Sequence, residues 1–284
     1  MGLQALIVCR NTRALAPATP TQSESTTIPI MAKATKIPAK KSPAKAAAAR
    51  KIAASEPASP KKASGKTKNP LAPERIHAIL DALDRTYPNA TCALTHRNAW
   101  ELLVATILSA QCTDVRVNMV TPALFHAYPT PHAMAQATPE AIQPIIASLS
   151  FFRMKAKSLV GAAKLVSEEF GGHVPQTMDE MLRIPGAARK TSNVVLGTWF
   201  GIPTGVVVDT HVMRLSRRLE LTTNDDAVKI ERDLMQIIPQ DHWISFSHEL
   251  IYHGRQICDA RKPKCPDCSM GTLCNSTDKT WASH

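Results

Sequence analysis

Four of the seven cysteines in this 284-residue chain lie close together near its C-terminal end, at Cys258, Cys265, Cys268 and Cys274. Thiolates at this spacing, in a segment that also contains Pro and Gly, can surround one compact metal centre. Structural zinc sites more often use two tight Cys-x-x-Cys pairs, and only Cys265 and Cys268 are that close. Uneven spacing favours a 4Fe–4S cluster, in which each iron takes one thiolate, and zinc is the alternative.

A Pro-Gly turn at Pro185 and Gly186 lies between two segments with helical patterns. A helix that begins directly after such a turn has unpaired backbone N–H groups and the positive end of the helix dipole. This arrangement binds anions, and on DNA the anion is a backbone phosphate. Lys190 falls in the first turn of that helix, where it can contact phosphate or act as an amine nucleophile. The segment alone favours the phosphate contact.

Asp209 follows the apolar run Val206–Val208 and directly precedes another helical segment. Aspartate is a common N-cap, because its side chain accepts hydrogen bonds from the unpaired N–H groups of the first turn. The same carboxylate, held at the start of a helix, can also face a reaction site. His211 is interpreted as a structural partner rather than as a base.

The secondary structure predicted around the cysteines, Lys190 and Asp209 is nearly all helical. Apolar residues recur at helical spacing from residue 70 onward, and strand-like alternation is nearly absent. Thr138-Pro139 and the capping box of Thr177–Glu180 indicate helix starts, and Gly171-Gly172 indicates a helix end. We therefore predict an all-α fold without repeats. The main predicted helices cover residues 73–87, 100–108, 152–170, 189–200, 210–219, 225–237 and 241–258, and others begin near 114 and 139.

The net charge of +11 is carried by the N-terminal segment. Residues 1–68 hold 13 of the 34 Lys and Arg but only 2 of the 23 Asp and Glu, which leaves 21 bases and 21 acids for the remainder. Residues 33–68, rich in Lys, Ala, Pro and Ser, predict a disordered polycation that binds polyanions without reading sequence. A solubilising tail is the alternative. Residues 1–30 are interpreted as a transit segment or, preferably, as sequence upstream of a true start at Met31.

Composition excludes several classes of protein. Hydrophobic residues make up 44% and charged residues 20% of the chain, which excludes a collagen-like or wholly disordered protein. The cysteines do not form the dense framework of a secreted disulfide protein. The longest uncharged run, residues 191–208, contains one Pro and three Gly, so we expect a buried helix and a loop there and no membrane span.

Three segments and the cysteine cluster together resemble one known family. The segments are LSAQCTDVRVN (residues 108–118), IPGAARKTSNVVL (184–196) and VVVDTHVMRL (206–215). With the four cysteines they resemble endonuclease III, the bifunctional DNA glycosylase of the helix-hairpin-helix superfamily, over roughly residues 70–276. The motifs follow the family's order at matching separations.

The resemblance implies two helical lobes on either side of a DNA-binding cleft. Residues 93–205 would form the lobe with the helix-hairpin-helix motif, and residues 69–92 and 206–284 the lobe that holds the cluster. Residues 1–68 would be the disordered basic tail. Lys190 and Asp209 would face each other across the cleft.

The resemblance also implies a reaction. The enzyme would remove oxidised pyrimidines from duplex DNA in base excision repair, with Lys190 as the nucleophile, a Schiff-base intermediate and β-elimination 3′ to the abasic site. Asp209 would be the catalytic carboxylate, and the four cysteines would hold a 4Fe–4S cluster. The residues implied in binding damaged or abasic duplex DNA are Gln111, Phe151, Pro185, Gly186, Ala187, Ala188, Arg189, Thr191 and His211.

Two of these residues are expected to enter the space left by the extruded base. Gln111 follows a helix end, and Phe151 lies where the family carries a leucine wedge. Adjacent residues of a helix point in different directions, so Phe151 and Phe152 should not both be buried, and we expect Phe152 inside and Phe151 exposed. The cluster loop is expected to hold Arg261, Lys262 and Lys264 against phosphate.

Two positions depart from the family pattern. Ala188 replaces the second glycine of the Gly-x-Gly hairpin, and its Cβ is expected to restrict a positive φ or to displace the backbone from phosphate. Ser150-Phe151 replaces a common Gly-Leu.

Two alternatives remain open. A monofunctional adenine glycosylase of the same superfamily shares the cysteine spacing. Lys190 argues against it, and so does Ala105, where its catalytic Glu is expected. A non-catalytic DNA-binding module would use the hairpin and the tail, and would make Lys190 and Asp209 coincidental. We expect a monomer without membrane contact. Its expected location is a bacterial-type cytoplasm or nucleoid, or an organelle or nucleus if residues 1–30 are a transit segment.

Overall fold

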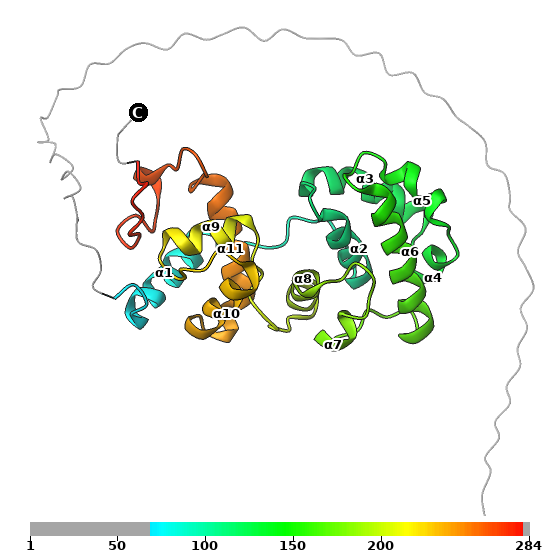
Figure 1. The fold of residues 1–284 in the computed structure, drawn as a ribbon, viewed down its shortest axis with the longest axis horizontal. Helices are drawn as coiled ribbons and strands as arrows, with labels where there is room; N and C mark the ends of the chain where they lie inside the picture. The colour runs from blue at the N-terminus through cyan, green and yellow to red at the C-terminus, as the bar shows by residue number, and fades with distance from the viewer. Residues whose placement is uncertain (1–68, 281–284) are drawn as a thin grey trace, which may run out of the picture. The chain divides into compact units, whose positions relative to one another are not determined.

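The computed structural model describes residues 69–280, so the predicted basic tail and its interpretation as a transit segment or upstream sequence lie outside the described residues. Figure 1 shows helices joined by loops, and no strand is assigned within the described part. The all-α prediction is confirmed. None of the described helices is long and apolar enough to cross a membrane. In chain order the helices are α1 (Pro73–Thr86), α2 (Ala99–Ser109), α3 (Asp114–Ala127), α4 (Pro131–Ala135), α5 (Pro139–Ile146), α6 (Phe152–Glu169), α7 (Met178–Met181), α8 (Arg189–Phe200), α9 (Thr210–Arg218), α10 (Ala227–Ile237) and α11 (Trp243–Gln256), with short 3₁₀ turns η1 (Gln240–His242) and η2 (Cys265–Asp267).

Side-chain caps set the start of several helices. Thr138 accepts the N–H of Ala141, and Pro139 occupies the first turn of α5. Thr177 accepts the N–H of Glu180 and donates its hydroxyl to the Glu180 carboxylate, so the predicted helix start at α7 and the pairing of these two side chains are present. Each such cap stabilises its helix by about 1 kcal/mol.

The buried apolar side chains form two separate clusters. One cluster draws its buried members from residues 94–196, which span α2 to α8. The other draws them from residues 76–87 and 206–270, which include α1, α9, α10 and α11. Figure 1 shows the same two groups of helices. The expected lobe boundaries themselves stay a prediction.

The central helix of the first cluster is α2, which packs against α3, α6 and α8. Leu102, Leu103, Val104 and Leu108 are all 0% exposed. A helix that is apolar all round has to be surrounded by other elements, and each buried Leu contributes about 1.5–3 kcal/mol. The C-terminal end of α2, which leads into Gln111, is therefore firmly placed.

The helix α1 joins the second cluster although it precedes the first in sequence. Its apolar face packs against α11. Arg75, only 5% exposed, donates to the backbone carbonyls of Leu219 and Leu273. These bonds connect α1 to the end of α9 and to the cysteine-containing loop. The buried apolar residues of α1 are Ile76, Ile79, Leu80, Ala82 and Leu83.

A buried carboxyl group at the α1–α11 contact, beside a half-exposed one, makes stability depend on pH. Glu249 is 3% exposed and hydrogen-bonds Asp84, which also lies 4.0 Å from the His242 ring. Burial, the hydrogen bond and the charge of Asp84 raise the pKa of Glu249 from 4.5 to about 8. Because the folded protein holds this proton more tightly than the unfolded chain, the resulting stability is complete below pH 4.5 and falls as the pH rises towards about 8.

We expect Glu249→Gln, which keeps the shape of the protonated carboxyl, to flatten this fall. Urea unfolding at a series of pH values between 4.5 and 8 measures it. The control is Glu168→Gln, which changes an exposed carboxylate on α6 and should follow the parent curve. Parallel curves for Glu249→Gln and the parent would contradict the prediction.

Candidate functional site

A cavity with a volume of about 730 Å³ is lined by residues from both groups of helices. Its walls come from the α2–α3 loop, the start of α8, the start of α9 and one side of α11. The hairpin residues 185–189 and Phe151 are not among its lining residues. Five residues singled out from the sequence line it together: Gln111, Lys190, Thr191, Asp209 and His211.

The turn before α8 packs closely on two neighbouring helices. Gly186 has φ +86°, and a Cβ at this position would lie 3.1 Å from side-chain atoms of both Ile107 and Ser158. Pro185 in turn lies against Gly161 of α6, where an added Cβ would be 3.2 Å from the proline ring. The turn therefore needs glycine at Gly186 for its backbone conformation and for the available space.

The structure overturns the expectation that Ala188 restricts a positive φ, while the expected displacement of the backbone from phosphate stays a prediction. This residue has φ −70° and ψ 170°, which any residue adopts, so its Cβ restricts no positive φ. It is the N-cap of α8 and gives no side-chain hydrogen bond, so the first N–H groups of α8 lack a side-chain cap. Ala187 is buried, and its own N–H donates to the carbonyl of Ile184. A buried side chain and an N–H group already bonded within the protein do not favour a phosphate contact. The contact expected of Ala187 therefore stays a prediction without support from its surroundings.

Arg189 and Lys190 follow each other in the first turn of α8 but have different surroundings. The Nε of Arg189 lies 3.0 Å from the Oε2 of Glu231, which is buried. Lys190 is exposed and lines the cavity, and no hydrogen bond or ion pair engages its side chain within residues 69–280. Its amine is therefore free to meet a ligand, whereas Arg189 is held by the protein.

Glu231 is the centre of a polar network that the sequence motifs did not reveal. It accepts hydrogen bonds from Arg189 and, at 2.8 Å, from the amide of Asn193. Asn193 in turn accepts the hydroxyl of Thr204 at 2.9 Å. A Cβ on Gly205 would overlap the Glu231 carboxylate, so this glycine leaves the space that the network occupies. The network joins α8, which carries Lys190, to α10.

A second ion pair between the two groups of helices was also missed. Arg255 of α11 lies 2.6 Å from the carboxylate of Asp114, the first residue of α3. Both residues line the large cavity. Neither belongs to a recognisable spacing pattern, because the contact joins positions far apart in the chain.

Asp209 has the geometry of a cap and of a cavity residue at once. Its Oδ1 accepts the N–H groups of His211 and Val212, both at 2.8 Å. Within the described residues Oδ2 has no hydrogen-bond partner, and the residue lines the same cavity as Lys190. One carboxylate oxygen thus fixes the side chain, and the other remains available for chemistry.

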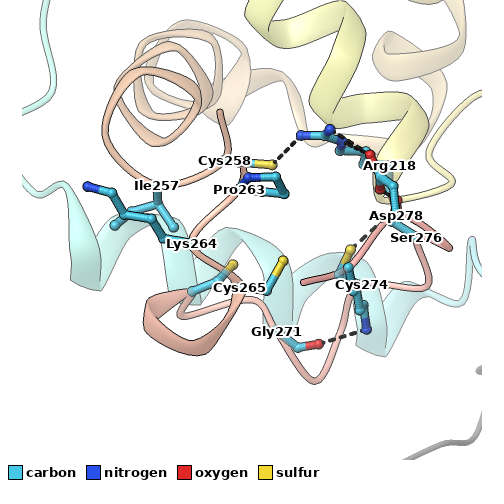
Figure 2. Close-up of a pocket in the computed structure, with 12 residues that line it drawn as sticks. Arg218, Ile257, Cys258, Pro263, Lys264, Cys265, Gly271, Cys274, Ser276 and Asp278 are labelled. Atoms are coloured by element: carbon cyan, nitrogen blue, oxygen red, sulfur yellow. Dashed lines mark hydrogen bonds and ion pairs between the residues drawn. The ribbon is translucent and has the colours of Figure 1, made fainter. Parts of the chain in front are cut away.

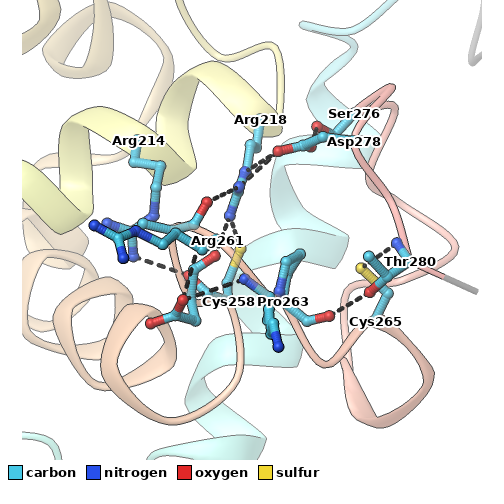
Figure 3. Close-up of polar contacts among 12 residues, drawn as sticks. Arg214, Arg218, Cys258, Arg261, Pro263, Cys265, Ser276, Asp278 and Thr280 are labelled. Atoms are coloured by element: carbon cyan, nitrogen blue, oxygen red, sulfur yellow. Dashed lines mark hydrogen bonds and ion pairs between the residues drawn. The ribbon is translucent and has the colours of Figure 1, made fainter. Parts of the chain in front are cut away.

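His211 is packed as a structural partner, as expected from the sequence. Its Nδ1 lies 3.2 Å from Arg214, which also donates to the backbone carbonyls of Gly254 and Cys258. A Cβ on Gly254 would lie 2.9 Å from the Cβ of His211, so the glycine allows α9 and α11 to approach. Arg214 and Arg218 of α9 both reach the loop at Cys258 (Figure 3). The DNA contact of His211 stays a prediction.

Gln111 and Phe151 share an unusual backbone conformation. Their φ angles are 55° and 57°, in the left-handed region that non-glycine residues seldom adopt. Such strain costs about 1–3 kcal/mol and is concentrated at functional sites. Phe151 is 61% exposed, whereas Phe152 packs against the first cluster, so the expectation about which ring is exposed is confirmed.

The four cysteines near the C-terminal end line a second, smaller cavity, with a volume of about 30 Å³. Figure 2 shows the sulfur atoms of Cys258, Cys265 and Cys274 around it. In the part of the chain that the structure describes, no three His, Cys, Asp or Glu side chains converge closely enough to share one metal ion. The thiols are spread over the wall of one cavity instead.

The surroundings of these sulfurs suit thiolates bound to a cation. Burial and the charges of the other three cysteines raise the pKa of Cys268 to about 11, and burial raises the pKa of Cys274. Such thiols ionise when a metal centre supplies the compensating charge. Nitrogen atoms also lie within hydrogen-bond distance of three sulfurs: Arg218 Nη1 at 3.2 Å from Cys258, the Thr280 N–H at 3.3 Å from Cys265, and His253 Nε2 at 3.3 Å from Cys268. The donor set therefore fits an iron–sulfur cluster.

Comparison with known proteins places this fold and site in one class. The family described as HhH-GPD superfamily base excision DNA repair protein matches residues 104–240. Endonuclease III of Synechocystis sp. is 55% identical over 203 residues, which cover 72% of this chain and 93% of that protein. Endonuclease III of Escherichia coli K12 is 36% identical over 201 residues, covering 71% and 95%. The solved structure of a trapped endonuclease III–DNA covalent intermediate is 40% identical, covers 72% of this chain and 96% of that one, and has a TM-score of 0.68.

The fold and the hairpin thus define a helix-hairpin-helix DNA repair protein. The chain belongs to the endonuclease III family of the HhH-GPD superfamily. Members of this family are bifunctional DNA glycosylase and AP lyase enzymes of base excision repair, so the class of enzyme expected from the sequence is confirmed. The family is also one that carries a 4Fe–4S cluster.

Proposed function

We propose that this enzyme removes oxidised pyrimidines from duplex DNA and cleaves the strand 3′ to the abasic site, with the amine of Lys190 as the nucleophile. One observation carries the proposal: the unpaired amine of Lys190 and the carboxylate of Asp209, which caps α9, line the same cavity. Two similar solved structures, both endonuclease III–DNA complexes, support duplex DNA as the partner.

The Lys190 amine performs the covalent step. A base inside a duplex is out of reach, so the damaged nucleotide is first rotated out into the cavity. The nitrogen of Lys190 then attacks C1′ of the sugar while the glycosidic bond breaks, and the base leaves with the bonding electron pair. Loss of the amine proton and opening of the sugar ring give a Schiff base. Removal of a C2′ proton finally expels the 3′ phosphate.

The Asp209 carboxylate assists the departure of the base. Positive charge develops on the sugar as the glycosidic bond breaks, and a fixed negative charge in the cavity stabilises it. Two backbone N–H groups hold Oδ1, so the side chain needs no rearrangement at that moment. The same carboxylate transfers protons during formation of the Schiff base.

Two surfaces would hold the DNA backbone. The first turn of α8 has N–H groups without a side-chain cap, and such a helix start binds phosphate. The loop between Cys258 and Cys265 contributes Arg261, Lys262 and Lys264, which are all exposed. The N–H groups of Arg261 and Lys262 donate to Asp259, which fixes the local turn.

We also infer that the four cysteines hold a 4Fe–4S cluster. Each iron of such a cluster takes one thiolate at a separate corner, which matches four thiols on the wall of one cavity. When bound, the cluster supplies a cross-link between the four cysteines, so that metal binding is coupled to folding of this loop. Its contribution is then to fix the basic loop in place.

Borohydride trapping tests the reaction. The enzyme is incubated with a duplex that contains a natural abasic site, and borohydride is added to reduce any Schiff base. We expect a covalent protein–DNA adduct whose mass maps to the peptide containing Lys190. Base removal is measured in parallel on a duplex that contains an oxidised pyrimidine. Cleavage of the abasic duplex without any adduct, or base removal from the second duplex without strand cleavage, would contradict the lyase assignment and favour a monofunctional glycosylase. DNA binding without either reaction would favour a binding module.

The cluster proposal predicts the metal content of the purified protein. We expect a yellow-brown protein with broad absorbance in the blue and about four irons per chain, because each of the four thiolates binds a separate iron. Elemental analysis together with the absorption spectrum measures this. One zinc per chain without colour would contradict the cluster. Thr272→Ala, at an exposed position between Cys268 and Cys274, is the control and should keep the iron.

The exposed ring of Phe151 predicts a specific loss of DNA affinity. We expect Phe151→Ala to weaken binding to a lesion duplex by at least about tenfold, since stacking of one aromatic ring on a base contributes about 1–3 kcal/mol. Fluorescence anisotropy measures the affinity, and thermal unfolding measures stability. Leu182→Ala, also an exposed apolar side chain, is the matched control. A lower melting temperature with unchanged affinity would mean that Phe151 is structural.

A further inference from the structure

A single sulfur atom joins the two loops that carry Gln111 and Phe151. Cys112, which follows Gln111, accepts the N–H of Ser150, which precedes Phe151, at 3.3 Å. The Nζ of Lys155 lies 3.2 Å from the same sulfur. The loop between α2 and α3 and the loop between α5 and α6 therefore meet at one atom beside both residues.

Lys155 makes this contact from an unusual position. Only 5% of the residue is exposed, although lysine side chains are seldom buried without a partner. Within residues 69–280, its side chain has a hydrogen bond to Cys112 and to no other group. A buried lysine amine needs a hydrogen-bond partner, and the Cys112 sulfur supplies it. Burial alone would raise the pKa of Cys112, but the bonds from Lys155 and Ser150 outweigh burial and lower it.

Cys92 shows that this environment is particular to Cys112. Both cysteines line the large cavity. Burial raises the pKa of Cys92, and no lysine donates to its sulfur in the described part of the chain. Cys92 is therefore a matched thiol for comparison.

The contact also accounts for the strained backbone on both sides of it. Gln111 and Phe151 are two of the three non-glycine residues with positive φ in the described range. Strained conformations persist only where surrounding contacts over-determine them. The sulfur belongs to Cys112, directly after Gln111, and it accepts a hydrogen bond from Ser150, directly before Phe151. It therefore restrains both strained positions at once.

We propose that Cys112 and Lys155 are positioning residues that lock these two loops into one relative geometry, so that Gln111 and Phe151 enter the duplex as a pair. The inference rests on the proposed function, in which these two side chains contact the lesion duplex. Cys112 and Lys155 act through the loops and not on the reacting sugar. Their removal should therefore weaken binding of the distorted duplex more than it slows the chemical step.

A double-mutant cycle measures whether the two loops act together. The probe is a duplex with a tetrahydrofuran abasic-site analogue, which has no C1′ hydroxyl and forms no Schiff base. Its affinity is measured for Gln111→Ala, Phe151→Ala and the double variant, in the parent and in the Cys112→Ala background. In the parent we expect the two losses to be coupled by about fivefold. In the Cys112→Ala background we expect the coupling to vanish.

Single substitutions at the pair give a second readout. Cys112→Ala and Lys155→Met, which keeps the aliphatic stem, should each weaken affinity by roughly tenfold. Combining them should add nothing further, because either change already breaks the contact. Single-turnover strand cleavage of an abasic duplex at saturating enzyme should change much less than the affinity. Cys112→Ser, which keeps an acceptor for Ser150, should recover part of the loss and covers the case in which Lys155→Met does not fold.

The controls separate a structural role from positioning. Cys92→Ala should leave affinity and coupling at parent values. Persistence of the full coupling in the Cys112→Ala background would overturn the proposal, as would an equal loss of affinity in Cys92→Ala. If Gln111→Ala and Phe151→Ala leave affinity unchanged, the proposal also fails. Borohydride trapping then shows independently whether the proposed reaction still stands.

Discussion

Replacement of Lys190 by Gln is expected to abolish both base removal and strand cleavage while DNA binding survives. Gln is polar and of similar length but has no nucleophilic amine, so neither attack at C1′ nor Schiff-base formation can occur. The Lys190 side chain is exposed and has no protein partner within residues 69–280, so the substitution should not disturb the fold. Glycosylase and lyase assays, with affinity measured by fluorescence anisotropy, check the prediction.

Lys164→Gln is the control for this experiment, because Lys164 is an exposed lysine on α6 away from the cavity lining. It should keep both activities. Full activity in Lys190→Gln would refute the nucleophile assignment. Loss of DNA binding in parallel with activity would instead indicate that Lys190 contacts phosphate, the alternative that the sequence left open.

Asp209→Asn is expected to lower turnover by roughly 100-fold or more, because it removes the negative charge and the proton acceptor together. The asparagine side-chain oxygen can still accept the N–H groups of His211 and Val212, and Asn caps helices as well as Asp does. Stability should therefore change by less than about 1 kcal/mol. Single-turnover base removal and thermal unfolding, measured on the same samples, separate the two roles.

The chain contains a matched control for the cap. Asp226 is the N-cap of α10 and accepts the N–H groups of Val228 and Lys229, both at 3.0 Å, but it does not line the cavity. Asp226→Asn should leave turnover unchanged. Equal effects of the two substitutions on stability, with no loss of turnover at Asp209, would reduce Asp209 to an ordinary helix cap.

Local sequence was sufficient for most of the helices, although not for the short helix α4, and for the residue types of the candidate site. The cap at Thr177 and the Pro at the start of α5 act over three or four residues, and the structure contains both. Lys190 and Asp209 were each singled out from a short local motif, but only the resemblance to endonuclease III predicted that they face one site. In the structure both residues line one cavity. The four cysteines were identified by spacing alone.

Long-range polar contacts could not be predicted in this way. The bonds of Arg189 to Glu231 and of Lys155 to Cys112 join helices or loops that are far apart in sequence. Sequence periodicity does not identify these partners, because each contact forms only when the helices pack against one another. The error at Ala188 has a similar origin, because the positive φ of the turn falls at Gly186, and only backbone coordinates distinguish the two positions.

The position of α1 has a consequence for how the protein is made. Synthesis delivers α1 first, then all of the helices of the first cluster, and only afterwards α9, α10 and α11, against which α1 packs. At about 5–20 residues per second, the ribosome needs roughly 10–30 seconds between completing α1 and completing α11. During that interval the first cluster can fold as a unit, while the apolar face of α1 and the buried guanidinium of Arg75 still lack their partners. The nascent chain therefore keeps the apolar face of α1 exposed to solvent until α9, α10 and α11 have emerged.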